Sequence, residues 1–168
     1  LKKPLIETVI SSEEIPTYSS GSFSYYTGGK VESGFRGSYN MMKEGSDKNF
    51  QSGYGLSLTY YQVKNTTDNI EGNFFNFGGR FLGKYFLSED AVSPFISGGL
   101  ALAFGQEKID YGNRTEESFF IGPILEETIG ISFDRKVSIE VGSFQVALFG
   151  SNLLPSDIGF MVGINFGN

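Results

Sequence analysis

Large apolar residues alternate with small or polar residues along most of the chain, and the pattern is clearest at the C-terminal end. In residues 157–168 every second position is large and apolar, whereas the positions between them are mostly small or polar. A period of two is typical of a β-strand whose two faces differ. This stretch therefore predicts a strand with one face suited to an apolar environment, formed by Ile158, Phe160, Val162, Ile164 and Phe166.

The same alternation predicts seven further strands, separated by polar or glycine-containing connections. We expect them at residues 22–27, 31–42, 50–62, 72–86, 94–105, 118–133 and 137–149. An even number of antiparallel strands lets a meander close on itself without an open edge. The pattern favours an all-β fold, an eight-stranded antiparallel up-and-down β-barrel over residues 21–168, preceded by an irregular N-terminal arm at residues 1–20.

Two of the predicted strands break the alternation. In residues 118–133, Pro123 and the pair Glu126–Glu127 disturb the first half, where we expect a bulge or an extension outside a membrane. In residues 137–149 a bulge at Gly142–Ser143 would keep two apolar rows on one face. Those rows differ in parity and consist of Val137, Ile139 and Val141, then Phe144, Val146 and Leu148.

Composition supports strands and leaves two orientations open. The 168 residues include 23 Gly, 17 Phe and 9 Tyr but no Cys, His or Trp, a bias that favours strands and turns over helices. Apolar runs are too short for a membrane-spanning helix, whereas a barrel strand needs only ~9–11 residues, half of them apolar. Alternation alone does not say which face is inside. The large apolar face lines the cavity of a soluble lipocalin-like barrel that binds a small apolar ligand, and it meets lipid in a membrane barrel.

Two observations favour the membrane barrel. The second face is rich in Gly, Ala and Ser, and strands 50–62 and 94–105 and the closing strand after Asp157 place no charged residue on it. The surface of a soluble protein is about a quarter or more charged. Aromatic residues near the ends of the apolar rows match the interfacial girdles of transmembrane barrels: Tyr54, Tyr60, Phe75, Tyr85, Phe104, Phe133, Phe144 and Phe166. We therefore expect a transmembrane β-barrel whose closing-strand row faces lipid.

Residues 79–86 (GRFLGKYF), residues 93–100 (SPFISGGL) and the closing strand carry a family resemblance. Over about residues 21–168 the chain resembles the small eight-stranded outer-membrane β-barrels of bacteria, of the OmpA, OmpX and opacity types. The resemblance implies a bacterial outer-membrane location and outer-membrane lipid as a neighbour. It also implies periplasmic connections at Lys43, Leu87 and Asp134, with those near Gly28, Val63, Gln106 and Gly150 facing outward. No apolar signal-peptide segment follows Lys2 and Lys3, so we expect the mature form of an exported protein.

Charged residues on the inward parity predict a network inside the barrel. They are Glu32, Arg36, Arg80, Lys84, Glu126 and Glu140. In a narrow lumen such charges must pair or stay hydrated, and we expect Arg80 to pair with Glu140 and Arg36 with Glu126. An eight-stranded barrel is just wide enough for side chains to fill. A filled lumen is favoured, and a narrow ion pore stays open as an alternative.

Several classes of chemistry are disfavoured. A net charge of −6 argues against a nucleic-acid partner, because phosphate binding requires a basic patch. Without His, the usual hydrolase triads and most zinc sites are absent. Adjacent Glu126 and Glu127 point to opposite faces and cannot converge. For Asp110, Glu116 and Glu117, a solvated loop is favoured over a Ca²⁺ site. We therefore expect no enzymatic activity, no catalytic residue, no cofactor and no metal.

The function predicted from these patterns is a structural and interaction protein of the outer membrane with a side-chain-filled lumen. It would present residues 63–71 and 106–117 to the exterior or to a larger membrane complex, including another outer-membrane or periplasmic protein. Charged and aromatic side chains of the second loop are the exposed candidates: Lys108, Asp110, Tyr111 and Arg114.

Overall fold

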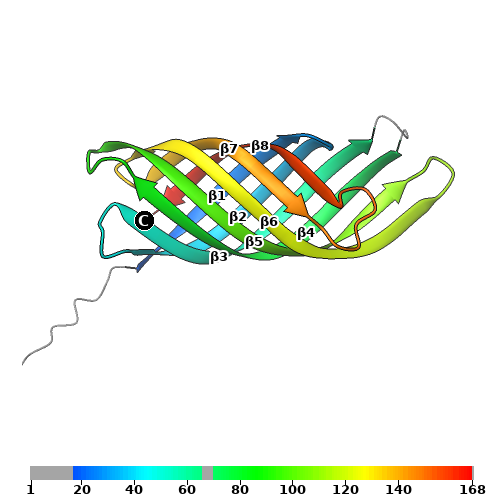
Figure 1. Cartoon of the computed structure of the whole chain (residues 1–168), viewed down its shortest axis with the longest axis horizontal. Coiled ribbons are helices and arrows are strands. Elements are labelled where there is room, and N and C mark those ends of the chain that lie inside the picture. The colour runs from blue at the N-terminus through cyan, green and yellow to red at the C-terminus, as the bar shows by residue number, and fades with distance from the viewer. Residues whose placement is uncertain (1–16, 66–69, 168) are drawn as a thin grey trace, which may run out of the picture.

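Eight antiparallel β-strands, each paired with the next in the chain, close into a barrel in the computed structural model, which describes residues 17–65 and 70–167 (Figure 1). The last strand pairs with the first, with Phe23 opposite Ile164, so the ring is complete. The predicted all-β, eight-stranded, up-and-down architecture is confirmed. The strands are β1 (Thr17–Gly28), β2 (Val31–Glu44), β3 (Phe50–Asn65), β4 (Ile70–Phe86), β5 (Val92–Asp110), β6 (Thr115–Phe133), β7 (Val137–Ala147) and β8 (Ser156–Gly167).

The two ends of the barrel differ in how far their hairpins extend. One end, the loop end, carries the β1–β2, β3–β4, β5–β6 and β7–β8 connections, and the other, the termini end, carries the remaining turns with the start of β1 and the end of β8 (Figure 1). At the loop end the β5–β6 hairpin rises furthest, because both strands have 19 residues whereas β1 and β8 have 12. The predicted loop at residues 106–117 is therefore mostly strand, with its turn between Asp110 and Thr115.

Large apolar side chains cover the outer face of the ring. The closing-strand row points outward, with exposed fractions from 40% at Ile164 to 69% at Phe160. Aromatic residues mark both edges of this apolar band, with Phe50 and Phe133 toward the termini end and Tyr60, Phe75 and Phe104 toward the loop end. So much contiguous exposed apolar surface is unfavourable in water and favourable in lipid. The outer face is thus a lipid-facing surface. Within the described residues, no helix is long and apolar enough to cross a membrane.

Above the loop-end aromatic row, the two faces of the sheet exchange polarity. The outward positions of β3 to β6 become polar there: Gln62, Lys64, Glu71, Asn73, Gln106, Lys108 and Glu117. The inward positions become buried and apolar: Tyr61, Val63, Phe74, Ile109 and Phe120. A sheet with its apolar face packed and its polar face solvated is the arrangement found in soluble proteins. The hairpins therefore leave the apolar band and continue into water around a core of their own.

The two predicted bulges are absent, whereas the alternative expected for residues 118–133, an extension beyond the apolar band, describes the upper part of β6. Pairing of β6 with β7 runs without a register shift past Gly142 and Ser143, and Pro123 pairs regularly with Leu102 of β5. The second apolar row of β7 therefore points inward: Phe144 is fully buried and packs inside the barrel rather than in an interfacial girdle. The row of large apolar residues therefore passes from the outer face to the interior along one regular strand, at the level where Phe144 pairs with Glu126.

Tight turns and the first strand complete the ring. Gly28 and Gly29 have φ of 99° and 61°, which favours glycine, and the backbone N–H of Lys30 donates to Asp157 Oδ2 at 2.7 Å. A side chain at Gly29 would collide with Asp157, so this turn must stay small. β1 begins at Thr17, earlier than the predicted barrel boundary at residue 21. The rest of the predicted N-terminal arm, residues 1–16, lies outside the described residues, as do residues 66–69 of the predicted loop at 63–71.

Candidate functional site

A buried cluster of charges crosses the lumen at the level of the apolar band. Glu126 of β6 points inward and is 4% exposed. Its Oε1 is ion-paired with Arg36 of β2 and accepts a hydrogen bond from the Tyr26 hydroxyl of β1 at 2.7 Å. Its Oε2 is 3.0 Å from Nη2 of Arg80 on β4. One carboxylate therefore ties four strands together through the interior.

Hydroxyl groups complete the shell of this cluster. Arg36 Nη2 donates to Ser24 Oγ at 3.4 Å, and Arg80 Nη1 donates to Ser38 Oγ at 2.9 Å. A buried guanidinium is expensive unless most of its donors find acceptors. The small polar residues of the inward face, which the alternation placed there, meet that requirement in part, because the Nε atoms of Arg36 and Arg80 are buried without an acceptor.

The structure divides the predicted network into two groups and leaves one member outside. Arg80 contacts Glu126 rather than the predicted partner Glu140, which instead accepts from Thr128 Oγ1 at 3.1 Å. Lys84 lies nearer the termini end, donates to Ser138 Oγ at 3.2 Å and sits 4.1 Å from the centre of the Phe95 ring.

Glu32 does not belong to the interior. Its side chain is exposed, because the β2–β3 register shifts between Val31 and Ser33 and Val31 takes the inward position. A one-residue irregularity of this kind moves every later side chain to the other face. The prediction that Glu32 lines the lumen is therefore wrong.

The space left inside the barrel at this level is small. A cavity of about 20 Å³ lies beside Arg80, Glu126 and Glu140, and another of about 30 Å³ opens toward the termini end. Each is about the volume of one water molecule in the liquid. Lys84 and Asn165 line both cavities and stand between them. The large apolar side chains that would line the cavity of a lipocalin-like barrel point outward instead.

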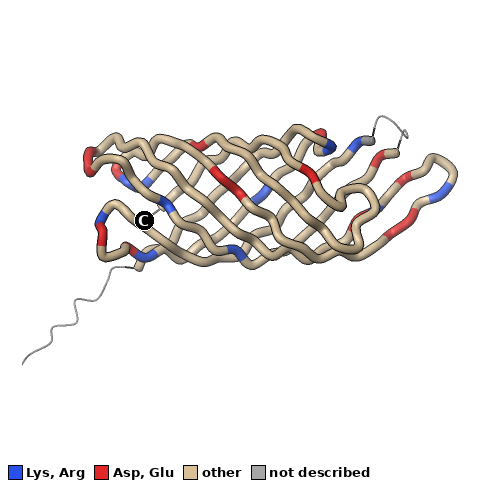
Figure 2. The backbone as a smooth tube through the Cα atoms, in the orientation of Figure 1, with Lys and Arg blue, Asp and Glu red and all other residues tan. Residues whose placement is uncertain are grey.

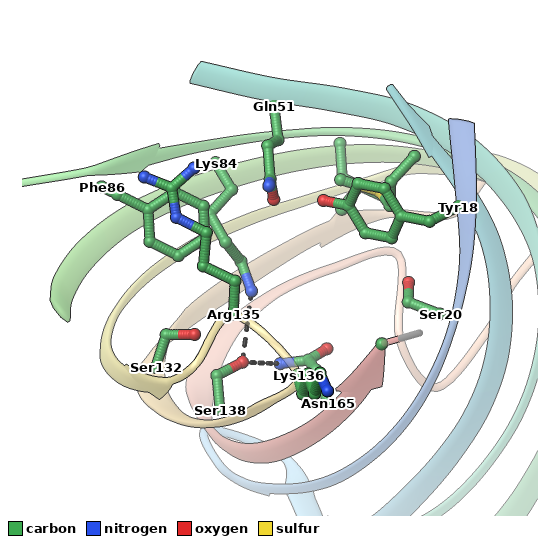
Figure 3. Close-up of a pocket in the computed structure, with 13 residues that line it drawn as sticks. Tyr18, Ser20, Gln51, Lys84, Phe86, Ser132, Arg135, Lys136, Ser138 and Asn165 are labelled. Carbon is green, nitrogen blue, oxygen red and sulfur yellow. Dashed lines mark hydrogen bonds between the residues drawn. The ribbon is translucent and has the colours of Figure 1, made fainter. Parts of the chain in front are cut away.

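The termini-end cavity has a basic lining (Figure 3). Lys84, Arg135 and Lys136 contribute cationic side chains, and Ser138 accepts hydrogen bonds from Lys84 and from Asn165 Nδ2, the latter at 3.4 Å. The Arg135 guanidinium lies 4.6 Å from the centre of the Phe86 ring and donates to the Lys48 carbonyl at 2.7 Å. Part of this positive charge is balanced within the chain, because Arg135 Nη1 also lies 3.9 Å from a Glu44 carboxylate oxygen.

An apolar core, which was not predicted from the alternation, fills the lumen at the loop end. Tyr26, Tyr61 and Phe144 meet at its base, with ring centres 5.0 to 6.2 Å apart. Leu153 and Leu154 of the β7–β8 loop cover them from above. Tyr26 belongs to both regions, because its ring lies in this core and its hydroxyl binds Glu126. The signal in the sequence was the run of polar residues that occupies the outward parity of β3 to β6 at this height.

A buried carboxylate anchors the β7–β8 loop across this core. Glu107 of β5 is fully buried, and its Oε1 accepts from the Ser118 hydroxyl at 2.6 Å and from the Asn152 backbone N–H at 2.7 Å. Its Oε2 accepts from the Ser151 hydroxyl at 2.7 Å. Hydrogen bonds to a carboxylate are about twice as strong as neutral ones. Glu107 thus holds the loop over the lumen.

The tip of the β5–β6 hairpin carries the predicted exposed residues. Lys108, Asp110 and Arg114 are exposed, whereas Tyr111 is half-buried against the apolar core. Arg114 lies 3.1 Å from Glu116 and stacks over the Tyr111 ring at 5.1 Å. The tip is therefore a small ordered surface of mixed charge supported from below.

Comparisons with known proteins identify the fold. No protein-family model matches the sequence, and neither does any curated protein. Among solved structures, Neisserial surface protein A (NspA) is 14% identical with a TM-score of 0.55, over 89% of this chain and 96% of that one. Ail, the attachment invasion locus protein of Yersinia pestis, is 16% identical with a TM-score of 0.51, over 90% and 97%.

A third similar structure is that of an enzyme. It is the outer-membrane enzyme PagL, 14% identical with a TM-score of 0.45, over 88% of this chain and 98% of that one. The prediction that this chain is not an enzyme is wrong as an exclusion, because a fold by itself does not decide whether a protein is catalytic.

At these identities the likeness establishes the fold, and the resemblance found in residues 79–86, 93–100 and the closing strand is confirmed at that level. The chain has the fold of the small eight-stranded outer-membrane β-barrels, and its apolar outer band is the surface with which such a barrel meets lipid.

Proposed function

We propose that this chain is a structural and interaction protein of a bacterial outer membrane, with a lumen closed by side chains and a contact surface at its loop end. The observation that carries the proposal is the exchange of polarity above the aromatic row. It turns the upper parts of β3 to β6 into a water-exposed extension with its own apolar core.

A rigid extension is well suited to binding a partner. Ordering a flexible loop on binding costs conformational entropy, whereas a paired hairpin has already lost it. Regular pairing continues to Asp110 opposite Thr115, and the Lys108 ammonium lies 3.9 Å from a Glu117 carboxylate oxygen on the outer side. Loop-end residues of β5 and β6 therefore keep a fixed shape before any partner arrives.

A closed lumen supports an interaction role over conduction. The charge cluster around Glu126, the apolar core around Phe144 and the anchored β7–β8 loop lie in series along the lumen. We expect planar-bilayer recordings of the wild-type chain to show no steady single-channel current. A stable ohmic conductance would contradict the closed lumen.

The orientation of the barrel is testable because the chain contains no cysteine. Asn113→Cys places a single thiol in the β5–β6 turn, and Ser46→Cys places one in the β2–β3 turn at the other end. A membrane-impermeant maleimide added to intact cells should label the first variant and should label the second only after the envelope is opened. The reverse pattern would place the loop end in the periplasm.

The contact surface itself is tested by photo-crosslinking in the native envelope. A photoreactive residue at Asn113 should give a discrete adduct that is lost when the tip charges are removed by Arg114→Ala and Lys108→Ala. The same residue at Ser46 is the matched control for an exposed turn. Adducts absent from position 113 in envelopes where the barrel is folded would contradict the proposed contact.

A further inference from the structure

One charged residue lies on the lipid-facing surface near the middle of the apolar band. Glu127 of β6 points outward between Leu125 and Ile129, which are 40% and 62% exposed, while the preceding Glu126 points inward. Figure 2 shows an acidic segment midway along the barrel, on the strand labelled β6 in Figure 1. At ~3.3 Å per residue and a tilt of ~40°, Glu127 lies about 15 Å from Phe133 along the barrel axis, roughly half the hydrocarbon thickness.

Glu127 has no partner within its own barrel. Among the described residues, its carboxylate makes no hydrogen bond and no ion pair. Ionisable groups inside a membrane are costly, and those that persist are usually paired. The position of Glu127 therefore implies a partner outside the barrel.

The remaining polar outward residues at mid-barrel lie beside Glu127. Ser143 of β7 pairs directly with it across the sheet, and Gln145 follows two residues later on the same face. On the other side Glu127 pairs with Gly98 of β5, which has no side chain to cover it. We call Gly98, Glu127, Ser143 and Gln145 the β6–β7 patch. Around the rest of the ring, outward positions at this height hold uncharged residues: mostly large ones such as Phe23, Tyr39, Leu56, Phe81 and Val162, with Gly37 and Gly79 between them.

We propose that the β6–β7 patch is the contact between two copies of this chain in the membrane. The patch contains a hydrogen-bond acceptor, the Glu127 carboxylate, next to two donors, the Ser143 hydroxyl and the Gln145 amide. A surface that holds both is self-complementary, as a two-fold interface requires. The described part of the outer face places no Lys or Arg in mid-band, so these neutral donors are what a second copy offers.

Membrane insertion fixes how the two patches meet. Both copies insert in the same direction, so the two-fold axis runs along the membrane normal and each residue meets partners at its own depth. Glu127 and Ser143 are paired neighbours of nearly equal depth. An axis between β6 and β7 therefore sets Glu127 of each copy against Ser143 of the other, and both hydroxyls donate to the opposing carboxylates. Gly98 leaves room for this approach, in the way that small residues do at membrane interfaces.

The inference rests on the proposed membrane location and goes beyond the loop-end contact, and its test separates the two. Val141→Cys places a thiol on the outer face of β7 beside the patch without removing any of its polar groups. Leu56→Cys is the matched control, because it is also outward and lies on β3, four strands away around the ring. Both variants are reconstituted at high lipid dilution and treated with a short bifunctional maleimide.

The expected result is about tenfold more covalent dimer for Val141→Cys than for Leu56→Cys, the ratio that hydrogen-bonded association in membranes can produce. Adding Glu127→Leu should reduce the yield to the control level, and adding Ser143→Ala should reduce it about threefold. Glu127→Gln keeps an acceptor and should retain most of the dimer. Equal yields from the two thiols, or a yield unaffected by Glu127→Leu, would overturn the proposed dimer.

Heat-modifiable gel migration of the wild-type and variant chains reports folding of the barrel separately. If the chains keep this migration but give no excess dimer, the proposed dimer is overturned and the proposed membrane location stands. A wild-type chain that is soluble without detergent and lacks such migration would overturn the proposed membrane location, and the dimer with it.

Discussion

The middle of the lumen is filled by charged side chains and its loop end by apolar ones, although the same strands carry both. At the level of the apolar band, β6 turns Glu126 inward to Arg36 and Arg80. Higher on β4, the strand that carries Arg80, Phe74 points inward to Phe120, and its outward neighbour Asn73 is polar. What changes between them is the surroundings of the outer face, from lipid to water. Which face of an alternating strand is apolar therefore follows the local solvent and changes where the solvent changes.

Substitutions in the two interior regions should therefore destabilise the barrel for different physical reasons. The middle is held by charge pairing, in which removal of one partner leaves uncompensated charge. The loop end is held by packing, in which removal of a side chain leaves a cavity.

The largest loss of stability should follow Glu126→Ala, which leaves two buried guanidinium groups without their carboxylate. We expect the free energy of unfolding to fall by about 3–5 kcal/mol, measured by denaturant titration in detergent micelles. Glu126→Gln keeps a hydrogen-bond acceptor and should cost less. A loss below about 1 kcal/mol for Glu126→Ala would show that the cluster is hydrated rather than paired.

Packing at the loop end is tested by Phe144→Ala, with Val141→Ala on the outer face of the same strand as its control. The first opens a cavity beside Tyr26 and Tyr61 and should cost about 3–4 kcal/mol, whereas the second removes two methyl groups from a lipid contact and should cost less than about 1.5 kcal/mol. The same titration measures both. Equal losses would mean that Phe144 lies outside the core.

A smaller effect is expected at the anchored loop. In Glu107→Gln a single oxygen remains to accept the hydrogen bonds that two oxygens accept in the wild-type chain, and the new amide group faces a donor. The free energy of unfolding should therefore fall by about 1–3 kcal/mol. Limited proteolysis should then cut residues 148–155 faster than in the wild-type chain. Glu117→Gln, on an exposed position of the neighbouring strand, is the control and should leave the cleavage rate unchanged.

The outer face could be predicted closely from the sequence, because a period of two survives wherever one side of the sheet meets lipid. The row from Ile158 to Phe166 and the inward position of Arg80 both follow from that period. Residues 79–86 and 93–100 also carried the family resemblance. In this part of the barrel a single assignment of faces holds along the whole strand.

The upper interior was missed because apolar residues were assigned to the outer face at every height. Phe144 was therefore given a bulge and an interfacial role, and Glu107 was placed in a solvated loop. Polar residues on the outward parity, such as Gln62 and Gln106, would have revealed the exchange. The failure at Glu32 has another cause, since a register shift beside a two-residue turn leaves no trace in the alternation.

The exchange of polarity marks the edge of the membrane. The free energy of unfolding from lipid vesicles, measured for two lysine substitutions on the outer face of β5, tests this position of the edge. Leu100→Lys places a charge in mid-band and should cost about 2–4 kcal/mol, whereas Gln106→Lys, just beyond Phe104, should cost less than about 1 kcal/mol. Similar costs at the two positions would contradict this account.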